Sequence, residues 1–174
     1  IGTNAFFLCM SLNGQLLIPE TVKTIGEHGF YCCSDFTGDL TIPDSVTSIG
    51  SGCFQFCDGI DGCLRLPNNL KCLNESLFSY CISLSGELKL PESITSIGNF
   101  VFTFCCSLVG DLVIPNKVDS IGIAAFSRCY GFTGYLVIPD TVKSINNRTF
   151  FFCDGLKGEL KIPKKLDVIK HSAF

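Results

Sequence analysis

The chain has 174 residues, of which 47% are hydrophobic and 17% are charged, a composition that supports a buried core and excludes a disordered segment. Its net charge of −3 comes from 16 acidic and 13 basic residues without a run of like charge, so we expect no nucleic acid partner. No stretch approaches the roughly 18 to 20 consecutive apolar residues of a membrane span.

Every proline in the chain obeys one spacing. The seven prolines lie 24 residues apart, at Pro19, Pro43, Pro67, Pro91, Pro115, Pro139 and Pro163. Self-similarity at such a period indicates a solenoid, in which each repeat stacks on its neighbours. Positions are numbered below from the proline of each repeat, so that +3 is the third residue after it and −3 the third before it.

Each repeat opens with glycine at −5 and a predicted strand. Leucine occupies −3 and Ile or Leu occupies −1 throughout. Leu88 and Leu90, for example, alternate with charged residues, so the leucines point to one face of a short strand and the charges to the other. The glycine lets the chain turn into this strand without a penalty for positive φ.

The proline predicts where this strand ends. It has no backbone N–H, so hydrogen bonding between repeats cannot continue through it, and the residue before it is held extended. Apolar residues at +3 and +6, such as Ile94 and Ile97, then return the chain to the interior.

Phenylalanine at +11 and cysteine at +14 complete the inward pattern. Phe102, Cys105 and Leu108 are spaced by three, which predicts a turn or two of α- or 3₁₀-helix with one buried edge. We expect two structural ladders from these positions, formed by Phe30, Phe54, Phe78, Phe102, Phe126 and Phe150 and by Cys33, Cys57, Cys81, Cys105, Cys129 and Cys153.

Residues 42–60, IPDSVTSIGSGCFQFCDGI, and 90–108, LPESITSIGNFVFTFCCSL, resemble the BspA-type leucine-rich repeat, whose units read I-P-x-S-V-T-x-I-G-x-x-A-F-x-x-C-x-x-L. The resemblance covers the whole chain, and the Gly-x-Leu segment before each strand is similar to the forms abundant in anaerobic protist parasites. The expected fold is an α/β solenoid, a right-handed leucine-rich repeat superhelix with a parallel β-sheet on one face and short helical or 3₁₀ turns on the other. The asparagine of the commonest leucine-rich repeats is missing, which puts its usual ladder in doubt.

The chain is predicted to be a single array, residues 1–174, of about seven 24-residue repeats. Each repeat buries side chains worth roughly 10–20 kcal/mol, against about 1.5 kcal/mol of ordering cost for each residue, so a lone repeat cannot fold. The sequence opens at +6 and closes at +11, and we expect an array cut within a repeat at both ends.

Twelve cysteines invite two interpretations. Those at +14, from Cys9 onward, are interpreted as buried free thiols, because free cysteine packs as a small hydrophobe. The alternative is a sporadic disulfide or metal site among the remaining five, Cys32, Cys53, Cys63, Cys72 and Cys106, whose redox state the sequence leaves open. The C-x-x-C pairs of zinc sites are missing, so no metal is expected.

The sequence predicts no enzyme and no cofactor. His28 and His171 lie almost six repeats apart, and no H-E-x-x-H, G-x-S-x-G or phosphate-binding glycine loop accompanies them. A periodic pattern does not bring unlike residues together once, as catalysis requires. The alternative, an enzyme embedded in a repeat, rests only on these histidines and the clustered cysteines.

Two further surface features stand out. Asn74 and Asn147 begin N-glycosylation sequons, which we expect in accessible loops of a secreted chain. Aromatic residues recur at +13, as Phe56, Tyr80, Phe104 and Phe152, and either shield the core or bind a ligand.

The outward strand positions −4 and −2 vary while the inward positions stay constant, so we predict the binding surface there. The candidate residues are Arg65, Glu87, Lys89, Asp111, Val113, Tyr135 and Val137. Val113, Tyr135 and Val137 form an apolar centre with Asp111 at its edge. The alternative is that the exposed valines serve only strand propensity.

The resemblance implies a non-catalytic module of a cell-surface or secreted adhesin or antigen, with host-cell or matrix proteins such as fibronectin as partners. An intracellular protein-interaction scaffold is the alternative, because so many free thiols are unusual in a secreted chain.

Overall fold

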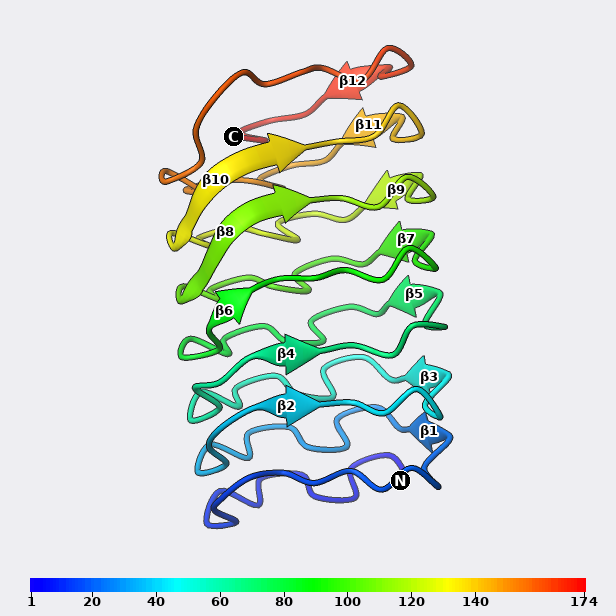
Figure 1. The fold of residues 1–174 in the computed structure, drawn as a ribbon, viewed down its shortest axis with the longest axis vertical. Helices are drawn as coiled ribbons and strands as arrows, with labels where there is room; N and C mark the ends of the chain where they lie inside the picture. The colour runs from blue at the N-terminus through cyan, green and yellow to red at the C-terminus, as the bar shows by residue number, and fades with distance from the viewer.

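The computed structural model describes all 174 residues and shows successive repeats stacked along the long axis of the molecule (Figure 1). Each repeat forms one turn of the solenoid, called a rung below, and the chain climbs the stack in sequence order. The predicted stacking into a parallel solenoid is therefore confirmed.

Two columns of short strands run along the stack (Figure 1). The first contains β2 (Leu40–Thr41), β4 (Leu64–Arg65), β6 (Gly86–Glu87), β8 (Leu108–Val113) and β10 (Phe132–Val137). The second, at +5 and +6, contains β1 (Thr24–Ile25), β3 (Ser48–Ile49), β5 (Cys72–Leu73), β7 (Ser96–Ile97), β9 (Ser120–Ile121), β11 (Ser144–Ile145) and β12 (Val168–Ile169).

All strand pairs are parallel, and most pairings join equivalent residues of adjacent rungs, such as Leu40 with Leu64 and Ser96 with Ser120. The first column divides into the sheets β2-β4 and β6-β8-β10, and the second into β1-β3 and β5-β7-β9-β11-β12. The outward residues of the first column are called the strand face.

The prediction of helical or 3₁₀ turns on the other side is wrong, because this side consists of successive turns without a helix. Alternate N–H groups leave the rung: those of Phe100, Phe102 and Phe104 donate to carbonyls of the next rung at 2.8 to 2.9 Å. The intervening N–H groups of Thr103 and Cys105 stay within the rung and bond three residues back. A helix would need all of these donors for itself. This side is called the turn face, and no helix in the structure is long and apolar enough to cross a membrane.

Left-handed residues make the turn face possible. The residues at +9 and +13 adopt positive φ in each rung, for example Phe100 at 58° and Phe104 at 62°. Such residues reverse the chain after each turn, which a spacing of three in the sequence does not reveal.

Each proline opens a turn. The N–H at +3 donates to the proline carbonyl, as in Val46 to Pro43 at 2.9 Å. Hydroxyl groups at +2 make some of the hydrogen bonds between rungs that the missing asparagine ladder would make. Ser45 Oγ donates to the Val22 carbonyl of the rung before it at 2.7 Å, and Ser93 makes the same bond to Leu70 at 2.6 Å.

The core is one continuous cluster of 41 buried residues that runs through the stack. The phenylalanines at +11 stack ring on ring along it, with centroids of neighbouring rings 5.0 to 5.8 Å apart and planes within 22° of parallel. Offset stacking at this separation stabilises aromatic pairs beyond their buried area.

The cysteines at +14 bridge adjacent rungs. The Cys105 thiol donates to the carbonyl of Phe78 at 3.1 Å, and the Cys129 thiol donates to that of Phe102 at 3.0 Å. Equivalent bonds begin at Cys33, Cys57, Cys81 and Cys153. A thiol suits this position because it combines an apolar body with a weak donor.

Candidate functional site

Each side chain at −4 on the strand face lies over the glycine at −5 of the next rung. A Cβ atom at Gly158 would lie 2.5 Å from ring atoms of Tyr135, and one at Gly86 would lie 2.8 Å from the sulfur of Cys63. Real Cβ atoms do not approach other atoms so closely. The constant glycine at −5 therefore leaves room for the variable −4 side chain of the rung before it. From the sequence alone, this glycine is explained only by its freedom to adopt positive φ.

Aspartate at −4 changes the backbone of the next rung. Asp111 Oδ1 accepts the N–H of Tyr135 at 2.7 Å, and Asp39 Oδ1 accepts that of Cys63 at 2.7 Å. Gly62 and Gly134 lie in the rungs that follow these two aspartates, and they are the two −5 glycines without positive φ. Asp111 thus holds the backbone that presents Tyr135.

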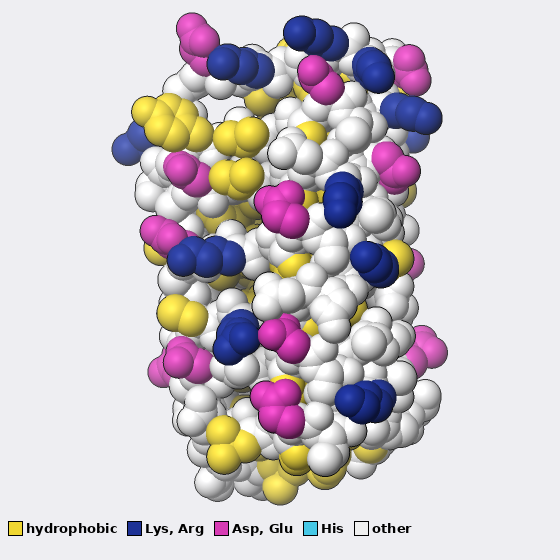
Figure 2. Space-filling model, turned by 45° about the vertical axis from the view of Figure 1, so that its right-hand side comes forward, with side chains coloured by type: hydrophobic (Ala, Val, Ile, Leu, Met, Phe, Trp, Pro, Cys, Tyr) yellow, Lys and Arg dark blue, Asp and Glu magenta, His cyan; other side chains and the backbone are white.

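Three exposed apolar side chains meet on adjacent rungs of β8 and β10. Tyr135 is 61% exposed, and Val113 and Val137 are each 46% exposed. Val113 pairs with Val137 in the parallel register of the two strands. We call this group the Tyr135 patch. Figure 2 shows hydrophobic side chains gathered at one edge of the view among basic and acidic ones.

Charged residues flank the Tyr135 patch on both sides along the stack. A hollow of about 430 Å³ lies between Tyr135, Val137, Glu159 and Lys161. A second, of about 320 Å³, connects Val113 with the rung before it through Glu87, Lys89, Glu92 and Asp111. Glu159 and Lys161 were missed as candidates, although their positions −4 and −2 in the next rung point to them.

Lys89 and Glu87 lie on the rung before Val113, and their charged atoms are 3.8 Å apart. Both are highly exposed, so this pair contributes little to stability and remains free to contact a partner. The predicted surface therefore brings Glu87, Lys89 and Asp111 next to the Tyr135 patch.

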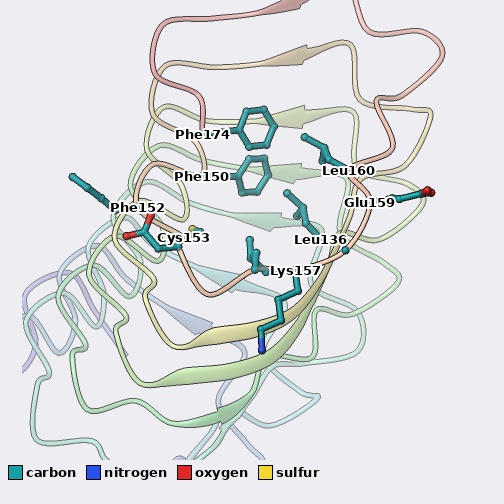
Figure 3. A pocket seen from close by; sticks show the side chains of 11 residues that line it. Leu136, Phe150, Phe152, Cys153, Lys157, Glu159, Leu160 and Phe174 are labelled. Atoms are coloured by element: carbon teal, nitrogen blue, oxygen red, sulfur yellow. The ribbon is translucent and has the colours of Figure 1, made fainter.

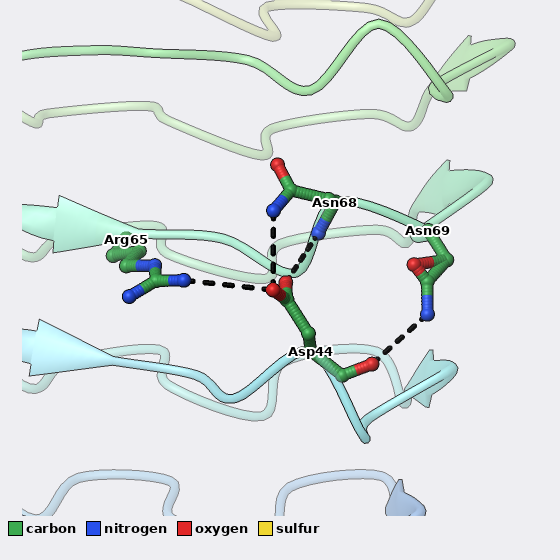
Figure 4. A network of polar contacts seen from close by, with 4 residues as sticks. All are labelled: Asp44, Arg65, Asn68 and Asn69. Carbon is green, nitrogen blue, oxygen red and sulfur yellow. Dashed lines mark hydrogen bonds and ion pairs between the residues drawn. The ribbon is translucent and has the colours of Figure 1, made fainter.

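Arg65 lies one rung further from the Tyr135 patch, in a hollow of about 460 Å³ that it shares with Lys89 and Glu92. Its Nη2 lies 3.5 Å from Asp44 Oδ2, and Asp44 also accepts the N–H of Asn68 at 2.8 Å and the Asn68 Nδ2 at 3.1 Å (Figure 4). Asn69 Nδ2 donates to the Asp44 carbonyl at 2.9 Å. The Asn68 N–H is the main cause that holds the pKa of Asp44 below its ordinary value. Desolvation opposes it, and the Asn68 side chain and Arg65 each add a smaller lowering effect.

The two sequon asparagines differ. Asn74 is half-buried, and its Nδ2, the atom to which a glycan attaches, donates to the Ile49 carbonyl at 2.6 Å. Asn146 Nδ2 makes the equivalent bond to the Ile121 carbonyl at 2.7 Å, whereas in rungs with glycine at this position the glycine N–H bonds the equivalent carbonyl, as Gly98 does at Leu73. A glycan on Asn74 would have to be compatible with this bond. Asn147 is exposed, although the hydroxyl of Thr149 in its sequon is buried and donates to the Asn146 carbonyl at 3.0 Å.

All twelve cysteines are free thiols in the structure. Burial raises the pKa of Cys81 and Cys153 to about 12, and raises those of Cys105 and Cys129 well above the ordinary value. These thiols stay protonated at neutral pH and are poor nucleophiles. Cys63 and Cys72 are exposed, Cys32 and Cys106 are half-buried, and Cys53 is buried. No three potential metal ligands cluster together.

A hollow of about 290 Å³ lies at the C-terminal end of the core, with Gly158 and Glu159 of the strand face among its lining residues. Figure 3 shows the rings of Phe150 and Phe174 stacked there, with Leu136 and Leu160 beside them and Glu159 pointing outward. It is continuous with the apolar interior, so it is a part of the core rather than of the binding surface.

The aromatic residues at +13 form a second stack on the turn face. The rings of Phe56, Tyr80 and Phe104 follow one another with centroids 4.8 and 4.5 Å apart. Arg128 takes the next place, and its guanidinium lies 5.1 Å from the rings of both Phe104 and Phe152. The sequence contained a signal for this feature, since Arg128 interrupts an aromatic column.

Six copies of the BspA type leucine rich repeat region match the chain, over residues 1–133 and 133–174. A search of curated proteins found no significant match.

Solved structures of bacterial leucine-rich repeat proteins share the fold. One from T. pallidum is 31% identical over 82% of this chain and 66% of its own, with a TM-score of 0.73. One from Bacteroides ovatus is 29% identical over 97% of this chain and 44% of its own, with a TM-score of 0.81. This chain thus spans less than two thirds of either relative. Proteins of this family and fold are generally non-catalytic, and the match over the whole sequence shows that the chain belongs to the BspA-type leucine-rich repeat family.

Proposed function

We propose that the chain is a protein-binding module of a cell-surface adhesin or antigen, and that the Tyr135 patch anchors the partner. The observation that carries this proposal is a contiguous group of exposed apolar side chains, Val113, Tyr135 and Val137, on two adjacent rungs of the strand face, whereas the exposed Leu17 of the same face stands alone. Protein interfaces are commonly dominated by a central aromatic anchor within a polar rim.

The seat of Tyr135 supports this role. Its ring lies against Gly158, and Asp111 holds its backbone N–H, so the exposed ring is positioned before a partner arrives. A partner that covers a pre-positioned ring loses less conformational entropy on binding. Glu87, Lys89, Glu159 and Lys161 would supply the charged rim.

The surface location and the partner class come from the family. BspA-type proteins are associated with cell surfaces and adhesion, and this association favours host-cell or matrix proteins as partners. The module would bind without catalysing a reaction, and without a cofactor or a metal. The alternative of an intracellular scaffold is favoured by the twelve free thiols.

The test is binding of the full array to immobilised matrix proteins, fibronectin among them, and to intact host cells. Tyr135→Ala should weaken binding at least tenfold, as expected for an aromatic hot spot, and Val137→Asp should abolish it. Thr41→Asp is the matched control for Val137→Asp, because Thr41 occupies the same exposed position, −2, on an earlier rung. Equal affinity of Tyr135→Ala and wild type would exclude the Tyr135 patch as the anchor, and absence of any extracellular partner would contradict the adhesin role.

Localisation separates the two alternatives. Antibody staining of intact, unpermeabilised cells that express the full-length protein should label their surface. Staining only after permeabilisation would favour the intracellular scaffold, whose partners would then be sought in a cell extract with the same three variants.

A further inference from the structure

A hollow of about 400 Å³ lies on the turn face, across the rungs that follow Pro91, Pro115 and Pro139, with His171 of the rung after Pro163 at its edge. It exists because small residues face it where the neighbouring rungs carry large ones. At +9 the column runs from Phe100 through Ala124 to Arg148, so the methyl group of Ala124 leaves a gap between two long side chains. At +12, Ser127 likewise precedes Phe151.

The charge of this hollow is opposite to that of the whole chain. Arg128, Arg148 and His171 line it, and none of its eleven lining residues is acidic, although the chain carries a net charge of −3. The ion pairs of the structure lie elsewhere, at Glu27, Asp44 and Glu87, so neither arginine has a carboxylate within 4.0 Å. Two arginines beside an apolar hollow without an acid attract an anion.

Arg128 is held in a fixed orientation. Its guanidinium lies between the rings of Phe104 and Phe152, and its Nη1 donates to the Tyr130 hydroxyl at 3.1 Å. Cation–π contacts on both faces of the guanidinium leave its edge for hydrogen bonds. Such an arrangement reduces the entropy lost when an oxyanion binds.

Arg148 approaches the same aromatic group from the next rung. Its guanidinium carbon lies 5.8 Å from the centre of the Phe151 ring, and the Phe151 and Phe152 rings are 4.2 Å apart. A short chain of contacts therefore connects the two arginines, with the hollow beside them.

Ser127 supplies a free hydroxyl in the hollow. Ser127 is 5% exposed and lines the hollow, and because no fully buried side-chain oxygen in the structure lacks a hydrogen-bond partner, its unpaired hydroxyl is accessible from the hollow. Thr103, one rung earlier in the same column, differs because its hydroxyl donates to the Ala124 carbonyl at 2.6 Å. An accessible hydroxyl among the lining residues can donate a hydrogen bond to a ligand in the hollow.

We propose that this hollow binds a small organic anion, an oxyanion group joined to a flat apolar body. The oxyanion contacts Arg128, Arg148 and Ser127, and the apolar body packs against Phe100, Phe104 and Ile123, which also line the hollow. The site lies on the opposite side of the rungs from the Tyr135 patch and does not depend on the protein-binding role.

The test is calorimetric titration of the 174-residue protein with phenyl phosphate, benzoate, inorganic phosphate and benzyl alcohol. Phenyl phosphate or benzoate should bind at least fivefold more tightly than inorganic phosphate, because the aryl body adds buried apolar area. The ranking of phenyl phosphate against benzoate identifies the preferred acid. Benzyl alcohol should not bind, since it lacks the charge.

Arg148→Gln should weaken aryl anion binding about tenfold, the loss expected for a charge-assisted hydrogen bond, and Arg148→Lys should restore part of it. Arg148 is exposed, so the variant should melt at the wild-type temperature. Arg65→Gln, on the strand face, is the matched control and should bind normally. No aryl anion binding at millimolar concentrations, or equal loss in both variants, would overturn the proposal.

Ala124→Leu provides an independent check, because the larger side chain would fill the gap between Phe100 and Arg148. It should abolish binding of the aryl anions and should leave the ion pairs on the strand face unchanged. Unchanged binding by a folded Ala124→Leu protein would show that the anion binds outside the hollow.

Discussion

The turn face and the strand face of the same rungs differ in how the backbone joins successive rungs. On the turn face, the N–H groups at +9, +11 and +13 of each rung bond the next rung, as at His28, Phe30 and Cys32. On the strand face, several strands are only two residues long, and the side chains at −4 range from aspartate to tyrosine. The backbone also bonds between rungs on the strand face, as from the Ile42 N–H to the Arg65 carbonyl at 3.0 Å. Because backbone groups join the rungs on both faces, the outward side chains of the strand face are free to differ.

The largest loss should follow from truncation of the phenylalanine stack behind the turn face. Phe102→Ala should reduce the free energy of unfolding by about 3–5 kcal/mol, because the ring is fully buried between Phe78 and Phe126. Urea denaturation would measure the loss. Phe100→Ala, at a partly exposed position of the same rung, is the control and should cost less than half as much. A cost below about 1 kcal/mol for Phe102→Ala would contradict a core stack.

The next largest effect concerns the contact between rungs at +7. A Cβ atom at Gly122 would lie 2.4 Å from the backbone nitrogen of Asn99, so Gly122→Ala should cost about 1–3 kcal/mol. The Gly122 N–H donates to the Ile97 carbonyl at 2.8 Å, and any Cβ at this position would displace that bond. Gly122→Asn should cost less than alanine despite its size, because its amide could replace the lost bond, as Asn74 Nδ2 and Asn146 Nδ2 bond the equivalent carbonyls. Gly2 occupies the same position on the first rung with open space around it, so Gly2→Ala should be neutral. Greater stability of the alanine than of the asparagine variant would refute this account.

A smaller effect should appear at the thiols. Cys105→Ala removes the bond to the Phe78 carbonyl and should cost about 1 kcal/mol at neutral pH. Because the folded pKa of Cys105 lies well above the ordinary value of 9.0, its contribution is complete below pH 9.0 and is lost as the pH rises. The wild type should therefore lose stability faster than Cys105→Ala above pH 9.0, by up to about 1.4 kcal/mol for each pH unit.

Denaturation series at several pH values would test this difference between wild type and Cys105→Ala. Cys63→Ala on the strand face, where the thiol is exposed, serves as the control at neutral pH and should not change stability. If the free energy of unfolding fell equally with pH in wild type and Cys105→Ala, the buried thiol would ionise as easily as in the unfolded chain.

The smallest effect should lie among the polar contacts near the strand face. The pKa of Asp44 is lowered from its ordinary value of 3.8, so its contribution is present above pH 3.8 and is lost as the pH falls through the folded value. Asp44→Asn should remove this acid sensitivity and slightly lower stability at neutral pH. Asp119→Asn, at an exposed carboxylate, is the control. If Asp44→Asn lost as much unfolding free energy as the wild type when the pH falls, the network of Figure 4 would contribute nothing to stability.

Some features of the candidate site follow from residue spacing and others do not. The grouping of Val113, Tyr135 and Val137 follows directly, since residues one period apart must stack in a solenoid. The role of Asp111 does not, because its carboxylate could face solvent or, as observed, accept the N–H of Tyr135. Asn74 misleads for the same reason: its sequon is local, whereas the partner of its amide lies on the rung before it.

The sequence by itself determined the period, the inward Leu, Ile, Phe and Cys positions and the stacking that they require, because periodic burial is encoded by residue type. Only the tertiary structure decided that the turn face has no helix, since its alternate N–H groups bond the next rung and sequence spacing does not say where a donor points. The hollow beside Arg128 was decided there as well. It arises from small and large side chains on neighbouring rungs, and such gaps depend on contacts between segments 24 residues apart.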